Sequence, residues 1–354
     1  MTETRDASTA STPLLEVTDL VKHFPVKSSG VVRRTIGQVQ AVDGVSFTLG
    51  KGQALGLVGE SGCGKTTTGR VITRLYDPTS GSMKFEGEEL GQLSAKQMLP
   101  YRREIQLIFQ DPYSSLNPRH TVGKIVGTPL EVHRTVAKNK MISTVQELLE
   151  VVGLNPEHYN RYPSEFSGGQ RQRIGIARAL ALRPKLIVAD EPVSALDVSI
   201  QAQVINLLQD LQREFDIAFL FIAHDLAIVR HFCPEIAVMY LGKIVEIGSR
   251  DQIYNTPHHP YTQALLSAAP DVKQAALGGR RERIRLEGDV PSPINPPSGC
   301  RFRTRCWKAQ DICAEKEPPL VEVGGRDVAC HFAEPLQVVT VPAVTEGSTA
   351  VSAK

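Results

Sequence analysis

The chain has 354 residues, of which 41% are hydrophobic and 22% charged, and its 40 basic side chains nearly balance 38 acidic ones. A chain of this length can bury a large core, and two domains are a fair expectation. A formal net charge of +2 provides no basic footprint for nucleic acid, so we expect no nucleic-acid partner.

The apolar pattern excludes a membrane-spanning chain. The longest clean apolar run, residues 217–223, has the length of a strand and is far shorter than the roughly 20 residues that a spanning helix needs. The first ten residues are polar and lack the apolar core of a secretory signal, so we expect a cytoplasmic protein. Residues 1–13 are expected to form a disordered tail and residues 335–354 a flexible tail.

Apolar patterns along the chain predict an α/β core. Period-two alternation or short apolar runs predict strands, in chain order, at residues 15–20, 39–49, 54–58, 105–109, 186–189 and 218–223. Helical spacing is expected from residue 65 onward and at residues 146–152, 170–182 and 204–215. The insert at 26–38 is predicted to be a surface hairpin or loop. Residues 278–285 are predicted to be a linker before the cysteine region, with a domain boundary near residues 270–285. Buried strands joined by crossover helices favour a parallel sheet.

A glycine-rich stretch joins the strand at 54–58 to the next helix. It fits the phosphate-binding loop pattern in the strand, loop and helix context that the pattern requires. Its glycines allow backbone N–H groups to point at phosphate oxygens, and the helix start adds the positive end of its dipole. A glycine-rich turn without a ligand is the alternative, which the full motif match disfavours. The predicted ATP-binding residues here are Gly59, Glu60, Ser61, Gly62, Cys63, Gly64, Lys65, Thr66 and Thr67.

Polar residues around this loop predict a magnesium-dependent phosphoryl site. Lys65 is expected to reach the β- and γ-phosphates, and Thr66 to offer its hydroxyl to Mg²⁺. The strand at 186–189 runs into two carboxylates, which places Asp190 beside the metal and Glu191 next to the attacking water. The alternative is an exposed acidic strand end, which is disfavoured by the apolar strand before it and the phosphate loop upstream.

A second anion site is predicted at Ser167, Gly168, Gly169 and Gln170, which open a helix shortly before the acidic strand. A serine hydroxyl and glycine N–H groups at a helix start suit a γ-phosphate, although Ser167 would also serve as an ordinary helix cap. The motif resembles the signature of ABC ATPases. This resemblance implies a P-loop ATPase fold with a RecA-like core, an antiparallel β subdomain and a helical signature subdomain at about 111–175. It also implies that the motif contacts the ATP of a partner subunit.

Three more polar residues match the ABC family in the expected order. The resemblance implies that Gln110, after the strand at 105–109, contacts magnesium together with Thr66 and Asp190 and senses membrane subunits. It implies that Asp197 helps to organise the dimer seam. It also implies that His224 hydrogen-bonds the γ-phosphate, so that Glu191, His224 and Gln110 form the catalytic set.

The aromatic residue that stacks on adenine is identified through the same resemblance. Phe24 is the best match, and Tyr76 and His23 are alternatives because the insert at 26–38 blurs the alignment.

Three segments narrow the resemblance from the ABC family to dipeptide and oligopeptide importer ATPases. Residues 111–119 resemble the segment that follows the glutamine in that family. Residues 259–266 and 291–297 resemble its C-terminal extension. The implied domains are an ABC nucleotide-binding domain at 14–270 and a small C-terminal extension with a cysteine cluster at 271–334.

Four of the six cysteines lie in this extension: Cys300, Cys306, Cys313 and Cys330. In a reducing compartment a metal is favoured over disulfides, and buried thiols without a ligand are a further alternative. The spacing lacks the paired C-x-x-C of zinc ribbons, which favours a [4Fe–4S] cluster over structural Zn²⁺. The resemblance favours the same cluster. Either metal is expected to brace the extension without touching ATP chemistry.

The motifs together predict an ATPase that powers import of dipeptides and oligopeptides from the cytoplasmic face of the cell membrane. The implied partners are a second ABC ATPase subunit, with a related chain favoured over a second copy, two transmembrane permease subunits and an extracytoplasmic peptide-binding protein. One alternative is a soluble ABC ATPase, which typically carries two nucleotide modules or a long coiled coil. Others are an importer ATPase for another solute, such as nickel or glycosides, and a metal-sensing regulator, which leaves the signature motif unexplained.

Overall fold

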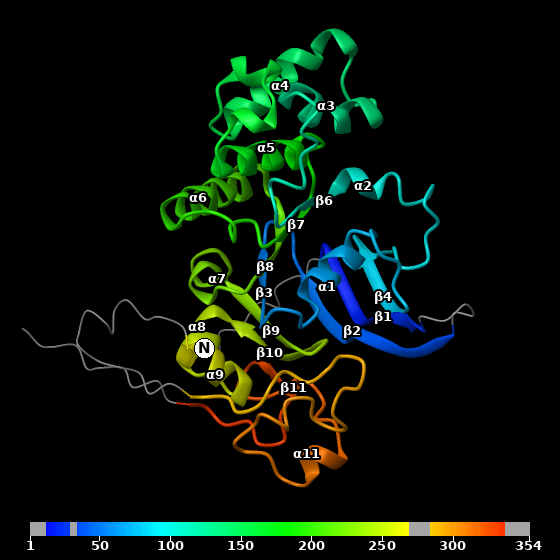
Figure 1. The fold of residues 1–354 in the computed structure, drawn as a ribbon, viewed down its shortest axis with the longest axis vertical. Coiled ribbons are helices and arrows are strands. Elements are labelled where there is room, and N and C mark those ends of the chain that lie inside the picture. The colour runs from blue at the N-terminus through cyan, green and yellow to red at the C-terminus, as the bar shows by residue number, and fades with distance from the viewer. Residues whose placement is uncertain (1–11, 29–33, 269–283, 337–354) are drawn as a thin grey trace, which may run out of the picture.

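The computed structural model describes residues 12–28, 34–268 and 284–336. Most of the two expected tails, of the expected linker at 278–285 and of the expected domain boundary at 270–285 lies outside the described residues. In Figure 1 a helical subdomain forms the upper part, a sheet core the middle and the C-terminal extension the lower tip. The described helices include none that is long and apolar enough to cross a membrane.

A large mixed sheet forms the centre of the molecule. In sheet order its strands are β11 (Val321–Glu322), β12 (Asp327–Val328), β10 (Lys243–Ser249), β9 (Glu235–Tyr240), β3 (Ala54–Val58), β8 (Ala218–Ala223), β7 (Leu186–Asp190) and β6 (Ile105–Ile108). Neighbours from β9 to β6 run parallel, whereas β10 and β12 join antiparallel. The predicted parallel α/β core is therefore confirmed.

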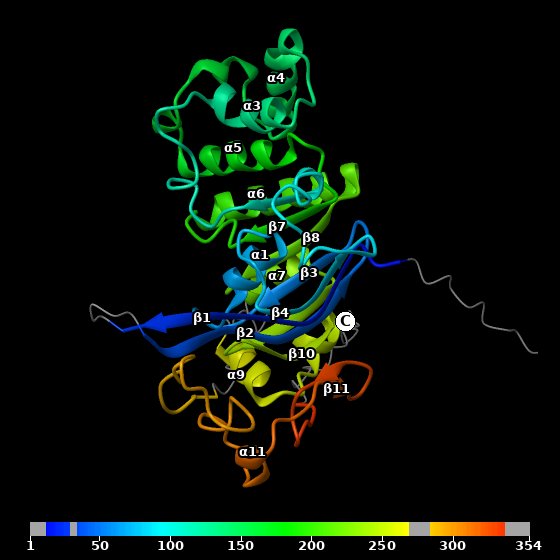
Figure 2. The same ribbon diagram turned by 90° about the vertical axis from the view of Figure 1, so that its right-hand side faces the viewer.

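Helices cover both faces of this sheet, build a separate subdomain above it and, at residues 312–315, lie in the C-terminal extension. They are α1 (Lys65–Ile72), α2 (Tyr101–Glu104), α3 (Val122–Val132), α4 (Met141–Val151), α5 (Gly168–Leu180), α6 (Val198–Phe215), α7 (Leu226–Phe232), α8 (Arg250–Asn255), α9 (Pro260–Ala268) and α11 (Ile312–Glu315). Helices α3, α4 and α5 lie together at the top of Figures 1 and 2.

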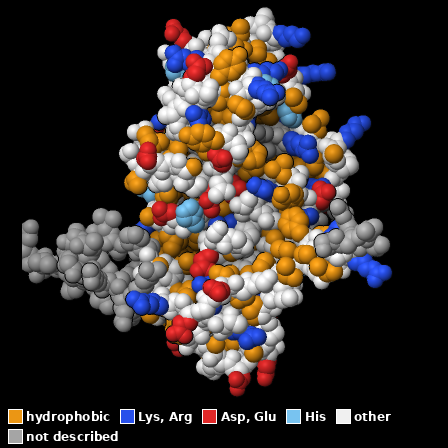
Figure 3. All heavy atoms as spheres, in the orientation of Figure 1, with side chains coloured by type: hydrophobic (Ala, Val, Ile, Leu, Met, Phe, Trp, Pro, Cys, Tyr) orange, Lys and Arg blue, Asp and Glu red, His pale blue; other side chains and the backbone are white. Residues whose placement is uncertain are grey.

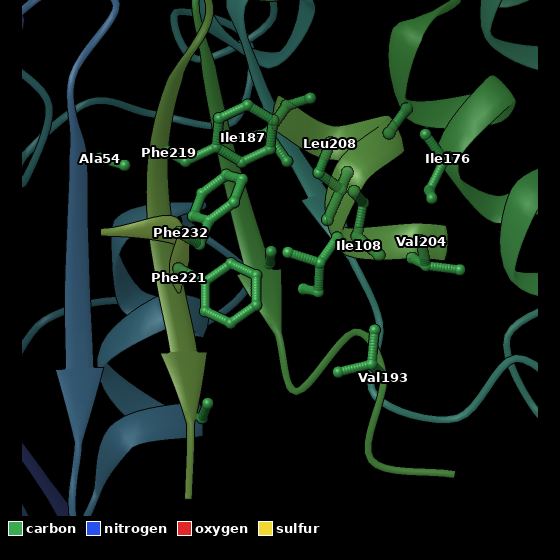
Figure 4. Close-up of a cluster of buried hydrophobic side chains, with 14 of the residues drawn as sticks. Ala54, Ile108, Ile176, Ile187, Val193, Val204, Leu208, Phe219, Phe221 and Phe232 are labelled. Carbon is green, nitrogen blue, oxygen red and sulfur yellow. The ribbon is translucent and has the colours of Figure 1, made fainter. Parts of the chain in front are cut away.

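Alternate residues of β8 pack on opposite faces of the sheet. Phe219 and Phe221 lie against Phe232 of α7, with ring centroids 5.3 and 4.8 Å apart (Figure 4). Leu220 and Ile222 belong to a second buried cluster, on the side of α1. Every residue of β3, β7 and β8 is buried, because parallel strands between two helix layers leave no face for water.

The antiparallel β subdomain is a second sheet in the order β2, β1, β4 and β5. Its strands are β1 (Leu15–Lys27), β2 (Thr35–Leu49), β4 (Ser80–Phe85) and β5 (Glu88–Glu89). Pairing of β1 with β2 continues outward to Lys27 and Thr35, so the described parts of the insert, residues 26–28 and 34–38, extend a long pair of strands. The predicted strands at 15–20 and 39–49 were too short, because several β-bulges interrupt the alternation that marked them.

The C-terminal extension packs against β10 and α9 at the lower tip (Figure 2). Its strands β11 and β12 form a short hairpin on the edge of the large sheet. Phe302 packs against both Tyr240 and Tyr261, at ring-centroid distances of 5.2 and 5.4 Å. On the face drawn in Figure 3, acidic side chains mark this tip, whereas Lys and Arg side chains project from the upper half.

Candidate functional site

The phosphate-loop residues leave β3 and enter α1, as predicted. Gly64 precedes α1 with a φ of +109°, and a Cβ there would meet the carbonyl oxygen of Ala41 at 2.0 Å, so only glycine fits. The ammonium of Lys65 is almost fully buried and donates to the carbonyl oxygens of Gly59 at 2.8 Å and Glu60 at 2.9 Å. The lysine therefore lies inside the loop that it is expected to serve.

Thr66 and Asp190 meet although they are far apart in sequence. The Thr66 hydroxyl donates to a carboxylate oxygen of Asp190 at 2.8 Å. Burial raises the pKa of Asp190, and the hydrogen bond from Thr66 acts against that rise. A hydroxyl and a carboxylate in contact supply hard oxygen donors, which is the chemistry that Mg²⁺ prefers, so these residues fit the expected ion.

Glu191 lies between the two other predicted catalytic side chains. One of its carboxylate oxygens accepts a hydrogen bond from Gln110 Nε2 at 2.9 Å and lies 3.2 Å from His224 Nδ1. Its backbone has a φ of +44°, in the left-handed region that non-glycine residues rarely adopt. Such strain is concentrated at functional sites. The carboxyl ends of β6, β7 and β8 thus bring the three residues together.

The signature residues begin α5 in the helical subdomain, away from α1 in both ribbon views (Figures 1 and 2). Ser167 Oγ accepts a hydrogen bond from the backbone N–H of Gln170 at 3.3 Å, and the Gln170 side chain accepts from the Ser167 N–H at 3.0 Å. This reciprocal capping box satisfies two helix-start donors. A Cβ on Gly169 would meet Ile200 of α6 at 2.5 Å, so the helix start packs closely on α6, with Gly168 beside it.

The residues predicted for the dimer seam and for adenine stacking lie on different elements, α6 and β1. Asp197 is exposed at the start of α6 and makes no side-chain cap hydrogen bond. Phe24 of β1 meets Tyr76 edge-on, with ring centroids 5.4 Å apart. His23 was an alternative to Phe24 for stacking on adenine. Its ring is instead hydrogen-bonded through Nε2 to Asp43 at 2.9 Å.

Cys300, Cys306, Cys313 and Cys330 line one small apolar cavity of about 10 Å³ in the extension. All four are free thiols, and burial raises the pKa of Cys300 to about 11. In the part of the chain that the structure describes, no group of three or more Cys, His, Asp or Glu side chains has metal-binding geometry. The fold therefore gathers the four thiols without arranging them as ligands.

Two residues that sequence reasoning missed contact the phosphate loop. The Tyr261 hydroxyl accepts a hydrogen bond from the Glu60 N–H at 2.8 Å, and Arg305 pairs with the Glu60 carboxylate at 2.7 and 3.1 Å. They lie 201 and 245 residues away from Glu60, so no local spacing could indicate them. The cysteine segment is thus much nearer the ATP site than its place in the sequence indicates.

The sequence matches known families in two places. Residues 42–194 match the family model for ABC transporters, which includes the phosphate loop, the signature motif and the acidic strand end. Residues 245–313 match the model for the C-terminal region of oligopeptide/dipeptide transporters.

Two relatives match over nearly the whole chain. The chain is 53% identical to the oligopeptide transport ATP-binding protein AppF of Bacillus subtilis (strain 168), over 90% of this chain and 97% of that protein. It is 49% identical to the dipeptide transport ATP-binding protein DppF of Escherichia coli (strain K12), over 91% of this chain and 95% of that protein. A solved ATP-binding cassette, a dimer in a post-hydrolysis state with ADP and Pi, has a TM-score of 0.59, 26% identity and coverage of 67% of this chain and 98% of its own. The chain therefore belongs to the oligopeptide and dipeptide importer family of ABC transporter ATP-binding subunits.

Proposed function

We propose that this chain hydrolyses ATP to power the import of dipeptides and oligopeptides through a membrane transporter. The observation that carries the ATPase is the convergence of Gln110 and His224 on Glu191, next to the contact between Thr66 and Asp190. Peptide import is supported by the match of residues 245–313 and by relatives named as oligopeptide and dipeptide transport proteins.

Each side chain has a task that follows from its position. Lys65 and the loop N–H groups bind and orient the phosphates, and Thr66, Asp190 and Gln110 would hold Mg²⁺. That ion would neutralise charge on the phosphate oxygens. Glu191 orients the attacking water and accepts its proton. His224, with Nδ1 at 3.2 Å from the Glu191 carboxylate, would hydrogen-bond the γ-phosphate.

A partner subunit is proposed to complete each site. Ser167 to Gln170 lie away from the chain's own phosphate loop, and their N–H groups at a helix start suit the γ-phosphate of another subunit. The similar cassette with ADP and Pi is itself a dimer. Hydrolysis by dilute isolated chain should therefore be slow and should rise with concentration or with a related subunit. A fully active monomer would contradict the shared site.

The membrane subunits are proposed to dock at residues 110–119. Tyr113, in this segment, is 61% exposed, and the Arg171 guanidinium lies 4.0 Å from its ring centroid. An exposed aromatic ring held by a cation is well suited to a protein interface. The chain would then act at the cytoplasmic face of the membrane, with two permease subunits and an extracytoplasmic peptide-binding protein.

The extension is proposed to hold a [4Fe–4S] cluster, with structural Zn²⁺ as the alternative. The support is that four thiols line one cavity and lack C-x-x-C spacing. Among the described residues these thiols are not arranged with metal-binding geometry, so either metal would require the side chains to move. Anaerobically purified protein should be brown, absorb at about 400 nm and contain sulfide, and Cys306→Ser should bleach it. Colourless protein with stoichiometric zinc would decide for Zn²⁺.

Uptake by the assembled transporter tests the function directly. The chain, a related ATPase subunit, two permeases and the binding protein are reconstituted in vesicles, and entry of a labelled dipeptide is measured with and without ATP. We expect ATP-dependent uptake that Lys65→Ala abolishes. ATP-driven entry of nickel or a glycoside instead of peptide would mean that the transporter imports another solute. Full ATPase activity without any membrane subunit would favour a soluble enzyme.

A further inference from the structure

An ion pair joins the C-terminal extension to the phosphate loop. The Arg305 guanidinium contacts Glu60 through two parallel bonds, Nη1 to Oε2 at 2.7 Å and Nη2 to Oε1 at 3.1 Å. The Arg305 side chain is 8% exposed and that of Glu60 28% exposed, so water screens the pair only in part. Bidentate pairing fixes the direction of both groups as well as their distance.

Glu60 is held at its backbone as well as at its side chain. Its N–H donates to the Tyr261 hydroxyl at 2.8 Å, and its carbonyl oxygen accepts from the Lys65 ammonium at 2.9 Å. Tyr261 is fully buried, and its ring packs on Tyr240 at a centroid distance of 4.7 Å. The second residue of the phosphate loop is therefore attached to both the core and the extension.

Charge gives this contact a consequence for nucleotide binding. Glu60 carries a carboxylate within a loop that binds a polyanion, and an uncompensated negative charge there repels phosphate. Arg305 neutralises that carboxylate from the side of the extension. The hydrogen bonds with Glu60 raise the pKa of Arg305 further, so the guanidinium stays charged.

We propose that Arg305 is a positioning residue for ATP binding. It neutralises Glu60 and holds the phosphate loop in one conformation. The loop therefore loses less conformational entropy when the nucleotide binds. It does not touch the reacting atoms, and its effect falls on affinity and not on turnover. The inference rests on the proposed assignment of residues 59–67 to ATP binding.

The experiment measures the Kd of the full chain for a fluorescent ATP analogue with Mg²⁺. Arg305→Gln should weaken binding about tenfold, because it leaves the Glu60 carboxylate uncompensated within the loop that binds the phosphates. Adding Glu60→Gln to that variant should recover most of the loss, because the repelling charge is then gone. In the assembled transporter, Arg305→Gln should raise KM for ATP by a similar factor and leave kcat within about twofold.

Two controls separate this effect from general damage. Arg303→Gln changes a nearby arginine whose side-chain hydrogen bonds, among the described residues, go to Ser298 of the extension, and it should leave the Kd unchanged. Lys65→Ala should lose binding, and a normal Kd in that variant would refute the loop assignment itself. If Lys65→Ala loses binding but Arg305→Gln does not, only the positioning role is overturned. Equal weakening in Arg305→Gln and in the double variant would also overturn it, since a disrupted extension would not respond to the charge of Glu60.

Discussion

The core strands bury side chains on both faces, whereas the described part of the C-terminal extension, residues 284–336, places only Phe302, Cys313 and Val328 among the buried hydrophobic residues. Burial of apolar area is the main favourable term in folding. The core thus has its own source of stability. The extension has too little apolar material to match it.

Arginines attach the extension to the core instead. Arg301 bonds Asp43, Gln40 and the Leu241 carbonyl oxygen, Arg326 approaches Glu246 to 3.6 Å, and Arg305 binds Glu60. Hydrogen bonds of charged groups depend on direction, and removing one partner leaves the other uncompensated. Single polar changes should therefore loosen the extension, while only apolar changes should damage the core.

The largest expected effect concerns chemistry at the core site. Glu191→Gln should lower ATP turnover by about 100-fold to 10,000-fold, because a general base that accepts the proton of water is lost. Nucleotide affinity should stay within a few-fold, since Glu191 does not bind phosphate. Turnover of the assembled transporter and the Kd for ATP measure the two quantities. Turnover near that of the unchanged chain would refute the role of Glu191.

Truncation of a core aromatic ring should have the next largest effect. Phe221→Ala removes a fully buried ring of β8 and should lower the free energy of unfolding by about 4 kcal/mol. Trp307→Ala in the extension removes a ring that is 46% exposed and should cost about 0.5 kcal/mol or less. Urea unfolding of the two variants tests the contrast. Equal losses would mean that the extension shares the stability of the core.

The buried pair of Glu246 in β10 with Arg326 of the extension should come third. Glu246 is fully buried, accepts hydrogen bonds from the N–H groups of His258 and His259, and lies 3.6 Å from Arg326. Arg326→Met should weaken docking of the extension by about 3 kcal/mol, because it leaves a buried carboxylate without its cation. Hydrogen exchange of residues 300–336 should accelerate, with the core strands unaffected. The exposed change Lys316→Met serves as the matched control and should alter neither.

The same division separates what could be predicted from the sequence from what could not. The bounds of β3 and β8 follow directly from apolar runs, and Asp190 follows from the strand that precedes it. These features are local, so a window of a few residues contains them. No strands were predicted at β9 and β10, although Leu241 and Gly242, both with positive φ, form the tight turn between them.

Long-range polar contacts leave no such local pattern. Arg301 follows Cys300 and Arg305 precedes Cys306 in a segment without clear periodicity. The side chains that they bond, Gln40, Asp43 and Glu60, are 245 to 261 residues away. Gln110, Glu191 and His224 were assigned to one catalytic set through family resemblance, and the structure brings their side chains together. Neither periodicity nor residue spacing could predict that the extension docks on the phosphate loop.

The smallest effect is expected from pH, at the junction of β2 with the extension. Asp43 meets Arg301, Lys243 at 3.2 Å and His23 at 2.9 Å, and Lys243 also pairs with Glu317 of the extension at 2.8 Å. Burial acts to raise the pKa of Asp43, but Lys243 and Arg301 outweigh it and hold that pKa below its usual range. A lowered pKa means that the folded state binds its proton less readily than the unfolded chain.

The contribution of Asp43 is therefore complete above about pH 4, the usual range of an unfolded Asp, and is lost as pH falls through the lower folded pKa. Asp43→Asn should lower the free energy of unfolding by about 1 kcal/mol at pH 6, the value typical of a partly exposed pair. The difference between the two proteins should shrink toward pH 3, because the unchanged chain then loses the same charge. Urea unfolding at both pH values measures it. A difference that stays constant between pH 6 and pH 3 would mean that the Asp43 carboxylate does not stabilise the junction through its charge.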